Sequence, residues 1–337
     1  MANIFKKIIE MGSPEFPFVF IDVGAMGGPH GEWKSLIGLM NIIGFEPDIR
    51  EFNELRSKSN KNTQYFNYAL SDKQEDFTLY ITKGHGKPSR FKPNMKLLSH
   101  FCDLESFYIE QEEVILSSRV RRLDDIIEQN SLKDVDFIKL DTQGSELSIL
   151  NGGEVNLIPK IFGIEVEVEF MPLYEKQPLF RQVDDFIVSK GFSLMDLQRC
   201  FWKRIDFYEY RGKGQLIFAN ALYFKEIDSF CHELSFIKNP IYIKSKIIKS
   251  ILTCLIYRMF DYAVVLVNSC RDRQLLNVKE SEKLIVMIKA YAQKGIPPLI
   301  HLGRFYNIFT RILNLFKPPS YLGWVDIDRD IGNTKNI

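Results

Sequence analysis

Cysteine is scarce and scattered in this 337-residue chain, which holds five cysteines and no CxxC pair or Cys/His cluster. That pattern argues against a structural zinc site, excludes a disulfide scaffold and fits a reducing compartment. The chain also lacks an excess of charge of either sign, because 44 Lys and Arg residues balance 43 Asp and Glu residues to a net +1. It therefore has no overall electrostatic attraction to nucleic acid, and we expect no nucleic-acid partner.

Long hydrophobic runs are missing as well. The most apolar stretch, 251–267, is short for a bilayer span and carries Arg258 and Asp261. The first residues include two lysines but no apolar segment of signal-peptide length behind them. We therefore expect a cytoplasmic protein. With 45% hydrophobic and 26% charged residues, the composition is globular and allows one large domain or two ordinary ones.

Short β-rich runs alternate with helical patterns over the first two-thirds of the chain. Continuous apolar runs such as 18–25 and 136–141 end in glycine or an acid, which is typical of buried parallel strands. We expect further strands at 41–48, 63–70, 77–82, 113–118, 162–168, 192–197 and 216–224, and helices at 32–40, 49–57, 123–129, 145–150 and 180–189. This alternation predicts an α/β fold with a doubly wound, mostly parallel sheet.

The pattern changes near Glu226, beyond which helical spacing takes over. We therefore divide the chain into an α/β domain at 1–226 and a C-terminal helical appendage at 227–337. The segment 238–258 holds five basic residues and no acid, opposite an isoleucine stripe. Such a segment can lie on an anionic membrane surface, which for a cytoplasmic protein is the inner face of the membrane. Alternatively, it can pack on a neighbouring helix or form a homodimer contact.

Ligands of doubly wound sheets bind beyond the carboxyl ends of the strands. A glycine-rich turn, Asp22 to Gly28, follows the first strand, and such a turn is by itself often only a turn. Glu46, 24 positions after Asp22, ends the second strand and can accept hydrogen bonds from both ribose hydroxyls of a nucleotide ligand. The spacing G-x-x-G-G of this turn does not match the dinucleotide fingerprint G-x-G-x-x-G. A nicotinamide-dependent oxidoreductase is therefore the weaker of the functional hypotheses.

Five segments carry a more specific signal: FIDVGAMGG, IIGFEPD, YALSD, DFIKLDTQGSELSILNGG and EVEFMPLYEKQPLF. In this order they resemble the FkbM family of S-adenosylmethionine-dependent methyltransferases, over about residues 16–225. The family frequently has Val-Glu where this chain has Thr142-Gln143. The resemblance implies a class I, Rossmann-like methyltransferase domain at 1–226, with the helical tail outside it.

The resemblance also implies how S-adenosylmethionine is held. It assigns the turn after the first strand to the amino-acid part of the cofactor, Glu46 to the ribose, the end of the third strand to the adenine, and Asp141 to the sulfonium. The complete set of cofactor residues is Asp22, Gly24, Ala25, Gly28, Glu46, Ala69, Leu70, Ser71 and Asp141.

Methyl transfer to a sugar hydroxyl needs a general base or a metal, because a hydroxyl is a poor nucleophile at neutral pH. Asp141 is our first candidate for the base, and His30 is the alternative. Glu165 and Glu167 share one face of a strand and form either an acceptor or metal site or a solvated strand edge. Oxygen ligands suit Mg²⁺, but no metal motif is present, so we assign no metal ligands.

These observations predict an S-adenosylmethionine-dependent O-methyltransferase. From the resemblance, its acceptor is a carbohydrate: a hydroxyl of a surface glycan or of a glycosylated metabolite. The alternative is a non-catalytic, methyltransferase-like scaffold whose helical tail recruits glycan-assembly partners. Binding of the cofactor distinguishes the two hypotheses.

Overall fold

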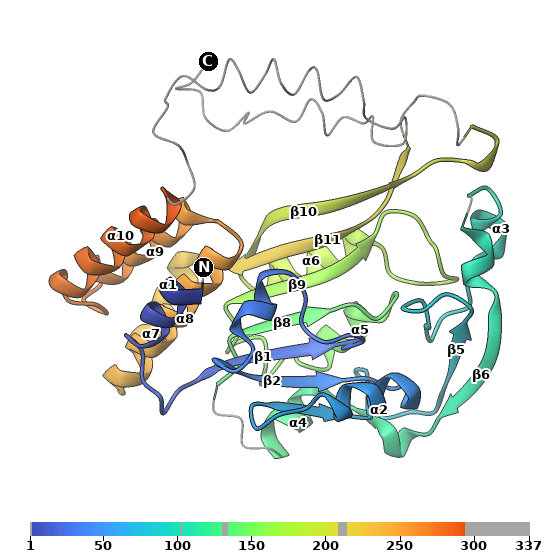
Figure 1. Cartoon of the computed structure of the whole chain (residues 1–337), viewed down its shortest axis with the longest axis horizontal. Helices are drawn as coiled ribbons and strands as arrows, with labels where there is room; N and C mark the ends of the chain where they lie inside the picture. Colours follow the sequence, from blue (N-terminus) through green and yellow to red (C-terminus); the bar gives the residue numbers. More distant parts are fainter. Residues whose placement is uncertain (1, 102, 130–133, 208–213, 294–337) are drawn as a thin grey trace.

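The computed structural model describes residues 2–101, 103–129, 134–207 and 214–293, and within them a seven-stranded sheet forms the centre (Figure 1). The strand order is β10-β11-β9-β8-β1-β2-β3, and only β11 runs antiparallel to its neighbours. The strands are β1 (Phe18–Val23), β2 (Met40–Phe45), β3 (Thr63–Phe66), β8 (Phe137–Leu140), β9 (Gly163–Glu169), β10 (Phe192–Trp202) and β11 (Gln215–Lys225). The predicted mostly parallel α/β sheet is confirmed.

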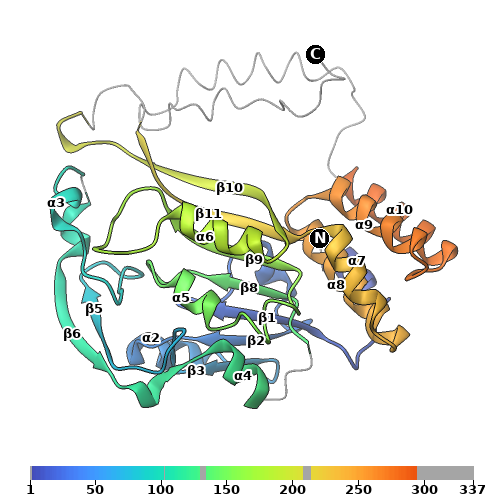
Figure 2. The same cartoon turned by 180° about the vertical axis from the view of Figure 1, so that it is seen from behind.

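Three helices cover one face of this sheet: α4 (Leu123–Gln129), α5 (Glu146–Asn151) and α6 (Phe180–Ser189). Their apolar residues, for example Ile127, Leu150 and Ile187, are buried against the aliphatic side chains of β1, β8 and β9. A further helix, α2 (Ile49–Ser57), joins β2 to β3. Figure 2 shows α5 and α6 in front of the sheet.

The opposite face is covered by helices from both ends of the chain: α1 (Ala2–Ile9), α7 (Ile227–Ser235), α8 (Pro240–Ile256), α9 (Phe260–Asp272) and α10 (Val278–Ala292). They share one hydrophobic core with β1 and β8, in which the Ile251 and Leu255 side chains of α8 are fully buried. The predicted appendage therefore completes the core of the sheet as far as residue 292, whereas 294–337 lies outside the described residues. The division at 226 stays a prediction.

The predicted helix at 32–40 is wrong. A short 3₁₀ helix, η1 (Gly31–Leu36), links β1 to β2 instead, and Gly38 follows it with φ +93°. A left-handed residue at that point ends the helical turn and leads the chain directly into β2. Because no α-helix follows β1, this face of the sheet depends on α8 for its cover.

Smaller elements gather at the end of the sheet away from the C-terminal helices (Figures 1 and 2). A hairpin of β5 (Phe77–Thr82) and β6 (Ile109–Ile115) stands there, and β4 (Ala69–Leu70) pairs with β7 (Val120–Arg121). The connection between β5 and β6 contains the short helix α3 (Met95–Leu98). The remaining 3₁₀ turns are η2 (Leu104–Phe107), η3 (Ser117–Arg119) and η4 (Ile205–Phe207).

Four buried charges fasten α8 to the sheet. Lys246 Nζ lies 2.7 Å from Asp134 Oδ1 and 2.8 Å from Asp136 Oδ1, and Lys249 pairs with both aspartates. Burial alone would raise the pKa of the Asp134 carboxyl, but the two ammonium groups hold it below its usual value. Asp136 also accepts a hydrogen bond from the backbone N–H of Val19, at 2.9 Å, which ties this cluster to β1.

The burial of α8 also bears on the membrane contact predicted for 238–258. Every residue from 245 to 256 is buried, and Lys244 pairs with Glu280 at 2.6 Å. Among the described residues, no helix is long and apolar enough to cross a bilayer. The contacts of this segment therefore give the membrane hypothesis no support.

We predict that Lys246→Met lowers the free energy of unfolding by about 3–5 kcal/mol, because it leaves two aspartates buried with one ammonium group between them. Equilibrium urea denaturation measures this loss. Lys244→Met, on the same helix, is the matched control, and its half-exposed pair is expected to contribute less than about 1 kcal/mol. Equal losses in the two variants would contradict the assignment.

Candidate functional site

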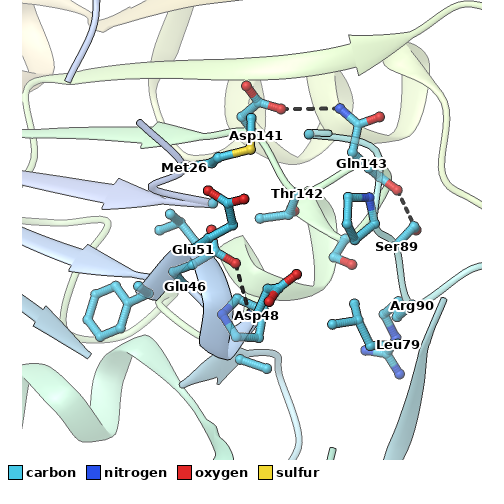
Figure 3. A pocket seen from close by; sticks show the side chains of 18 of the residues that line it. Met26, Glu46, Asp48, Glu51, Leu79, Ser89, Arg90, Asp141, Thr142 and Gln143 are labelled. Atoms are coloured by element: carbon cyan, nitrogen blue, oxygen red, sulfur yellow. Dashed lines mark hydrogen bonds between the residues drawn. The ribbon is translucent and has the colours of Figure 1, made fainter. Parts of the chain in front are cut away.

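A cavity of about 230 Å³ lies at the carboxyl ends of β1, β2 and β8. Its wall also includes β5 and the segment 82–90. Figure 3 shows Asp141 and Gln143 at one end of the cavity, Leu79 and Arg90 at the other, and Glu46 between them. The cavity is therefore an elongated site with a polar end and an end that is partly apolar.

Gly24 allows the ends of β1 and β8 to approach each other. It has φ +69°, and a Cβ atom built on it would lie 1.9 Å from the carbonyl oxygen of Asp141. No side chain fits in that space. The glycine that follows β1 therefore brings the backbone of β1 against the start of the Asp141 loop.

Glu46 lies on the cavity wall, although its side chain is largely buried. Its Oε1 accepts a hydrogen bond from the backbone N–H of Asp48 at 3.0 Å. Burial raises the pKa of the Glu46 carboxyl to about 7; the hydrogen bond from Asp48 opposes this shift, and the Asp48 and Glu51 charges add to it. Asp48 in turn caps α2 by accepting the backbone N–H of Arg50 at 2.9 Å.

The loop after β8 folds around Glu146. The Glu146 carboxylate accepts the backbone N–H of Thr142 at 2.7 Å, the Thr142 hydroxyl at 2.9 Å and the backbone N–H of Gly144 at 2.9 Å. Burial raises its pKa to about 7. Our sequence reasoning missed Glu146, and the available signal was an acid five positions after Asp141 in the most specific segment.

Asp141 is held from two sides at the polar end of the cavity. Lys139 Nζ lies 3.2 Å from its Oδ2, and the Gln143 amide donates to its Oδ1 at 3.2 Å. The same amide group donates to Glu167, and Gln143 accepts the Tyr174 hydroxyl at 2.8 Å. Gln143 has φ +57°, a left-handed backbone conformation that is costly for a residue other than glycine.

Glu167 lies beside this cluster, outside the cavity wall. Burial raises the pKa of its carboxyl well above the usual value, and the charges of Asp141 and Glu169 add to that effect. A carboxyl group in such surroundings takes up a proton more readily than a free glutamate.

His30 and Glu165, which are 135 positions apart in the sequence, form a hydrogen bond of 3.1 Å between Nε2 and Oε1. Glu165 also accepts the Tyr257 hydroxyl. Burial would raise the pKa of Glu165, but these two hydrogen bonds lower it, and the bond to Glu165 raises the pKa of His30. The His30 side chain is 48% exposed, so a ligand can reach it.

Asp22 is buried, and neither of its carboxylate oxygens has a hydrogen-bond partner among the described residues. Its nearest cation is Lys139, at 3.9 Å. Burial raises the pKa of the Asp22 carboxyl to about 6. Orphaned buried acceptors at the edge of a cavity fit a ligand that brings hydrogen-bond donors.

Of the cofactor and catalytic residues predicted from the sequence, some lie in the cavity wall and the others lie outside it. The cavity wall includes Gly24, Glu46, Ala69, Leu70 and Asp141. Outside the wall lie Asp22, Ala25, Gly28, Ser71, His30, Glu165 and Glu167, of which Ser71 accepts a hydrogen bond from Arg90 at 3.0 Å. Each of these roles stays a prediction.

The acids of the site do not converge on a metal position. Within the described ranges, no three His, Cys, Asp or Glu side chains come close enough together to hold an ion. Lys139 and the Gln143 amide occupy the Asp141 oxygens instead. The magnesium alternative therefore has no support.

Known proteins resemble this chain over the region that forms the cavity. The model of the methyltransferase FkbM domain matches residues 22–194. The 2-O-methyltransferase NoeI of Sinorhizobium fredii is 25% identical over 190 residues, which is 56% of this chain and 77% of that protein. The match to the family model ends before α7.

Two solved structures match this chain at low sequence identity. A SAM-dependent methyltransferase from Anabaena variabilis is 8% identical, with a TM-score of 0.31, over 66% of this chain and 82% of that one. TYW2 from M. jannaschii, in complex with AdoMet, is 10% identical, with a TM-score of 0.27, over 67% of this chain and 77% of that one.

We predict that Gly24→Ala destabilises the fold more than Gly27→Ala. Both positions have positive φ, so both variants carry a left-handed penalty of about 1–2 kcal/mol. Only at Gly24 does the new Cβ meet backbone, which we expect to cost a further ~1–3 kcal/mol. Urea denaturation of the two variants isolates the contact, and identical midpoints would argue against it.

Proposed function

Because the chain belongs to the methyltransferase FkbM domain family, we propose that it transfers a methyl group from S-adenosylmethionine to a hydroxyl of a carbohydrate. The acceptor would be a surface glycan or a glycosylated metabolite. The relative NoeI is named a 2-O-methyltransferase, which favours an oxygen acceptor. The observation that carries the proposal is the His30–Glu165 hydrogen bond, because Glu165 is the strand neighbour of Lys139 in the cavity wall.

The residues of the cavity suit the proposed cofactor. Glu46 lies midway along the cavity, where its carboxylate can accept the ribose hydroxyls. Tyr68, Ala69 and Leu70 supply an apolar wall for the adenine. Asp141, on the wall, offers negative charge to the sulfonium group, and Asp22, buried just behind the wall with two orphaned oxygens, adds negative charge for the ammonium group.

S-adenosylmethionine supplies a methyl group bonded to a positively charged sulfur. The chain's own residues have to place the acceptor oxygen in line with that bond and remove the hydroxyl proton. As the C–O bond forms and the C–S bond breaks, His30 takes the proton. Glu165 needs a donor, so in neutral His30 the proton resides on Nε2 and Nδ1 is left as the base.

Asp141 and Glu167 have different roles in this proposal. The partners of Asp141 fix its carboxylate at the cavity end, where it holds the sulfonium side of the donor. Glu167, joined to it through Gln143, faces the acceptor side and binds sugar hydroxyls. Asp141→Asn should therefore lower the affinity for the cofactor. An unchanged kcat in that variant would exclude Asp141 as the base.

We predict that cofactor binding strengthens with pH through the titration of Glu46. With a pKa of about 7, Glu46 is mostly protonated at pH 6 and mostly ionised at pH 8, so affinity should rise about tenfold between these values. Isothermal titration calorimetry measures this rise. Glu46→Gln should reduce the rise to about twofold, the part due to Asp22 with its pKa of about 6. Glu46→Ala should weaken binding about 10–150-fold.

We predict that His30→Ala lowers kcat by about 10²–10⁴-fold and leaves cofactor affinity unchanged. Because Glu165 raises the pKa of His30 above 6.5, activity should increase with pH through a limb above that value. Glu165→Gln should move the limb to lower pH. The assay is mass spectrometry of candidate glycans incubated with a deuterated methyl donor.

The same measurements can refute the proposal. Full activity in His30→Ala would exclude the base, and a chain that binds no S-adenosylmethionine would instead favour the scaffold hypothesis. A chelator included in the assay should leave the rate unchanged.

A further inference from the structure

Helix α8 ends beside Glu165 and presents Tyr257 to it. We infer that Tyr257 is a positioning residue: through its hydroxyl, the C-terminal helix sets the orientation of the Glu165 carboxylate, which in turn orients His30. This inference rests on the proposed function, in which His30 is the base. It assigns a role in the reaction to a helix that lies outside the family match at 22–194.

The direction of the hydrogen bonds supports this role. The indole N–H of Trp33 donates to the Tyr257 oxygen at 2.9 Å, and an indole has no acceptor atom in its plane. The single proton of the Tyr257 hydroxyl is therefore free to be donated to Glu165 Oε2. Since His30 donates to Oε1, each carboxylate oxygen has its own donor, and the carboxylate cannot rotate without losing both.

The ring of Tyr257 is fixed as well as its hydroxyl. It stacks on Phe137, with centroids 5.6 Å apart and planes at 21°, and it meets the edges of Trp33 and Phe224, each at 6.1 Å. Phe137 belongs to β8, two residues before Lys139. Tyr257 is therefore packed between the helix and the strand that leads to Asp141.

The backbone also sets where the helix stops. After the C-cap Tyr257, the N–H of Met259 bonds to the carbonyl of Cys254 at 2.8 Å, and the N–H of Arg258 bonds to that of Leu255 at 3.2 Å. These two bonds form a Schellman motif, in which Arg258 takes the left-handed position with φ +60°. A non-glycine residue in that conformation shows that the surroundings determine the helix end.

A double-mutant cycle tests the inference. Tyr257→Phe removes only the hydroxyl, and we expect it to lower kcat about tenfold while leaving the KM for S-adenosylmethionine unchanged. In a Glu165→Gln background the same substitution should have little further effect, because Tyr257 acts through Glu165. The matched control is Tyr262→Phe, which removes a hydroxyl bonded to the backbone carbonyl of Lys225 at 2.8 Å in the same helical layer and should leave kcat unchanged.

Carbon-13 NMR of labelled Glu165 provides a readout that does not depend on turnover. Loss of the Tyr257 donor should raise the pKa of the Glu165 carboxyl, whereas Tyr262→Phe should not. An equal loss of kcat in both backgrounds, wild-type kcat in Tyr257→Phe, or an unchanged Glu165 titration would overturn the inference. Failure of the proposed function is distinguishable, because it appears as full activity in His30→Ala while the Glu165 titration still responds to Tyr257→Phe.

Discussion

The docking of α8 on the sheet is the interaction on which the remaining structure depends. Only a 3₁₀ turn follows β1, so the apolar face of β1 and β8 takes much of its cover from this helix. Apolar burial supplies most of the attraction, but it does not fix the helix along its own axis. The pairs of Lys246 and Lys249 with Asp134 and Asp136 fix that position at the middle of the helix, and the Tyr257 hydrogen bonds fix it at the C-terminal end.

The position of α8 matters for the carboxylates beside it. Asp22, Asp141 and Glu165 all lie close to a single lysine of the cavity wall, Lys139. Lys139, whose neighbours across the sheet are Asp22 and Glu165, is the one lysine in the cavity wall near Asp141. Burial alone would lower the pKa of Lys139, but the surrounding carboxylates raise it. Neutral hydrogen-bond donors stabilise the negative charge that Lys139 does not balance. The Gln143 amide donates to Asp141, and the Tyr257 hydroxyl donates to Glu165.

The sequence indicated the parts of this arrangement that depend on local pattern. Buried parallel strands are continuous apolar runs, so β1, β8 and β9 could be placed, and the polar residues at their carboxyl ends could be picked out as a site. Glu146 stands in the most specific segment, but the sequence pattern does not show that the loop after β8 folds around it. Tyr257 could not be recognised from local pattern, because its partners come from distant segments. The 3₁₀ turn of η1 was missed for a related reason, since the left-handed backbone at Gly38 outweighs the helical spacing around it.

Lys139 lies between the cavity, where we propose that the methyl donor binds, and the His30–Glu165 pair, where we propose that the acceptor is deprotonated. On one side the cavity, from Leu79 to Asp141, has the shape and polarity for a nucleoside donor, and its residues come from loops that follow β1, β2 and β8. On the other side His30 is half exposed, and its partners Glu165 and Tyr257 come from the sheet and the C-terminal helix. If the donor occupies the cavity, the acceptor has to approach from the His30 side. Changes in the C-terminal helices should therefore alter turnover and acceptor choice more than cofactor affinity, because Tyr257 contacts Glu165, the partner of the proposed base, whereas the cavity wall includes no residue of these helices.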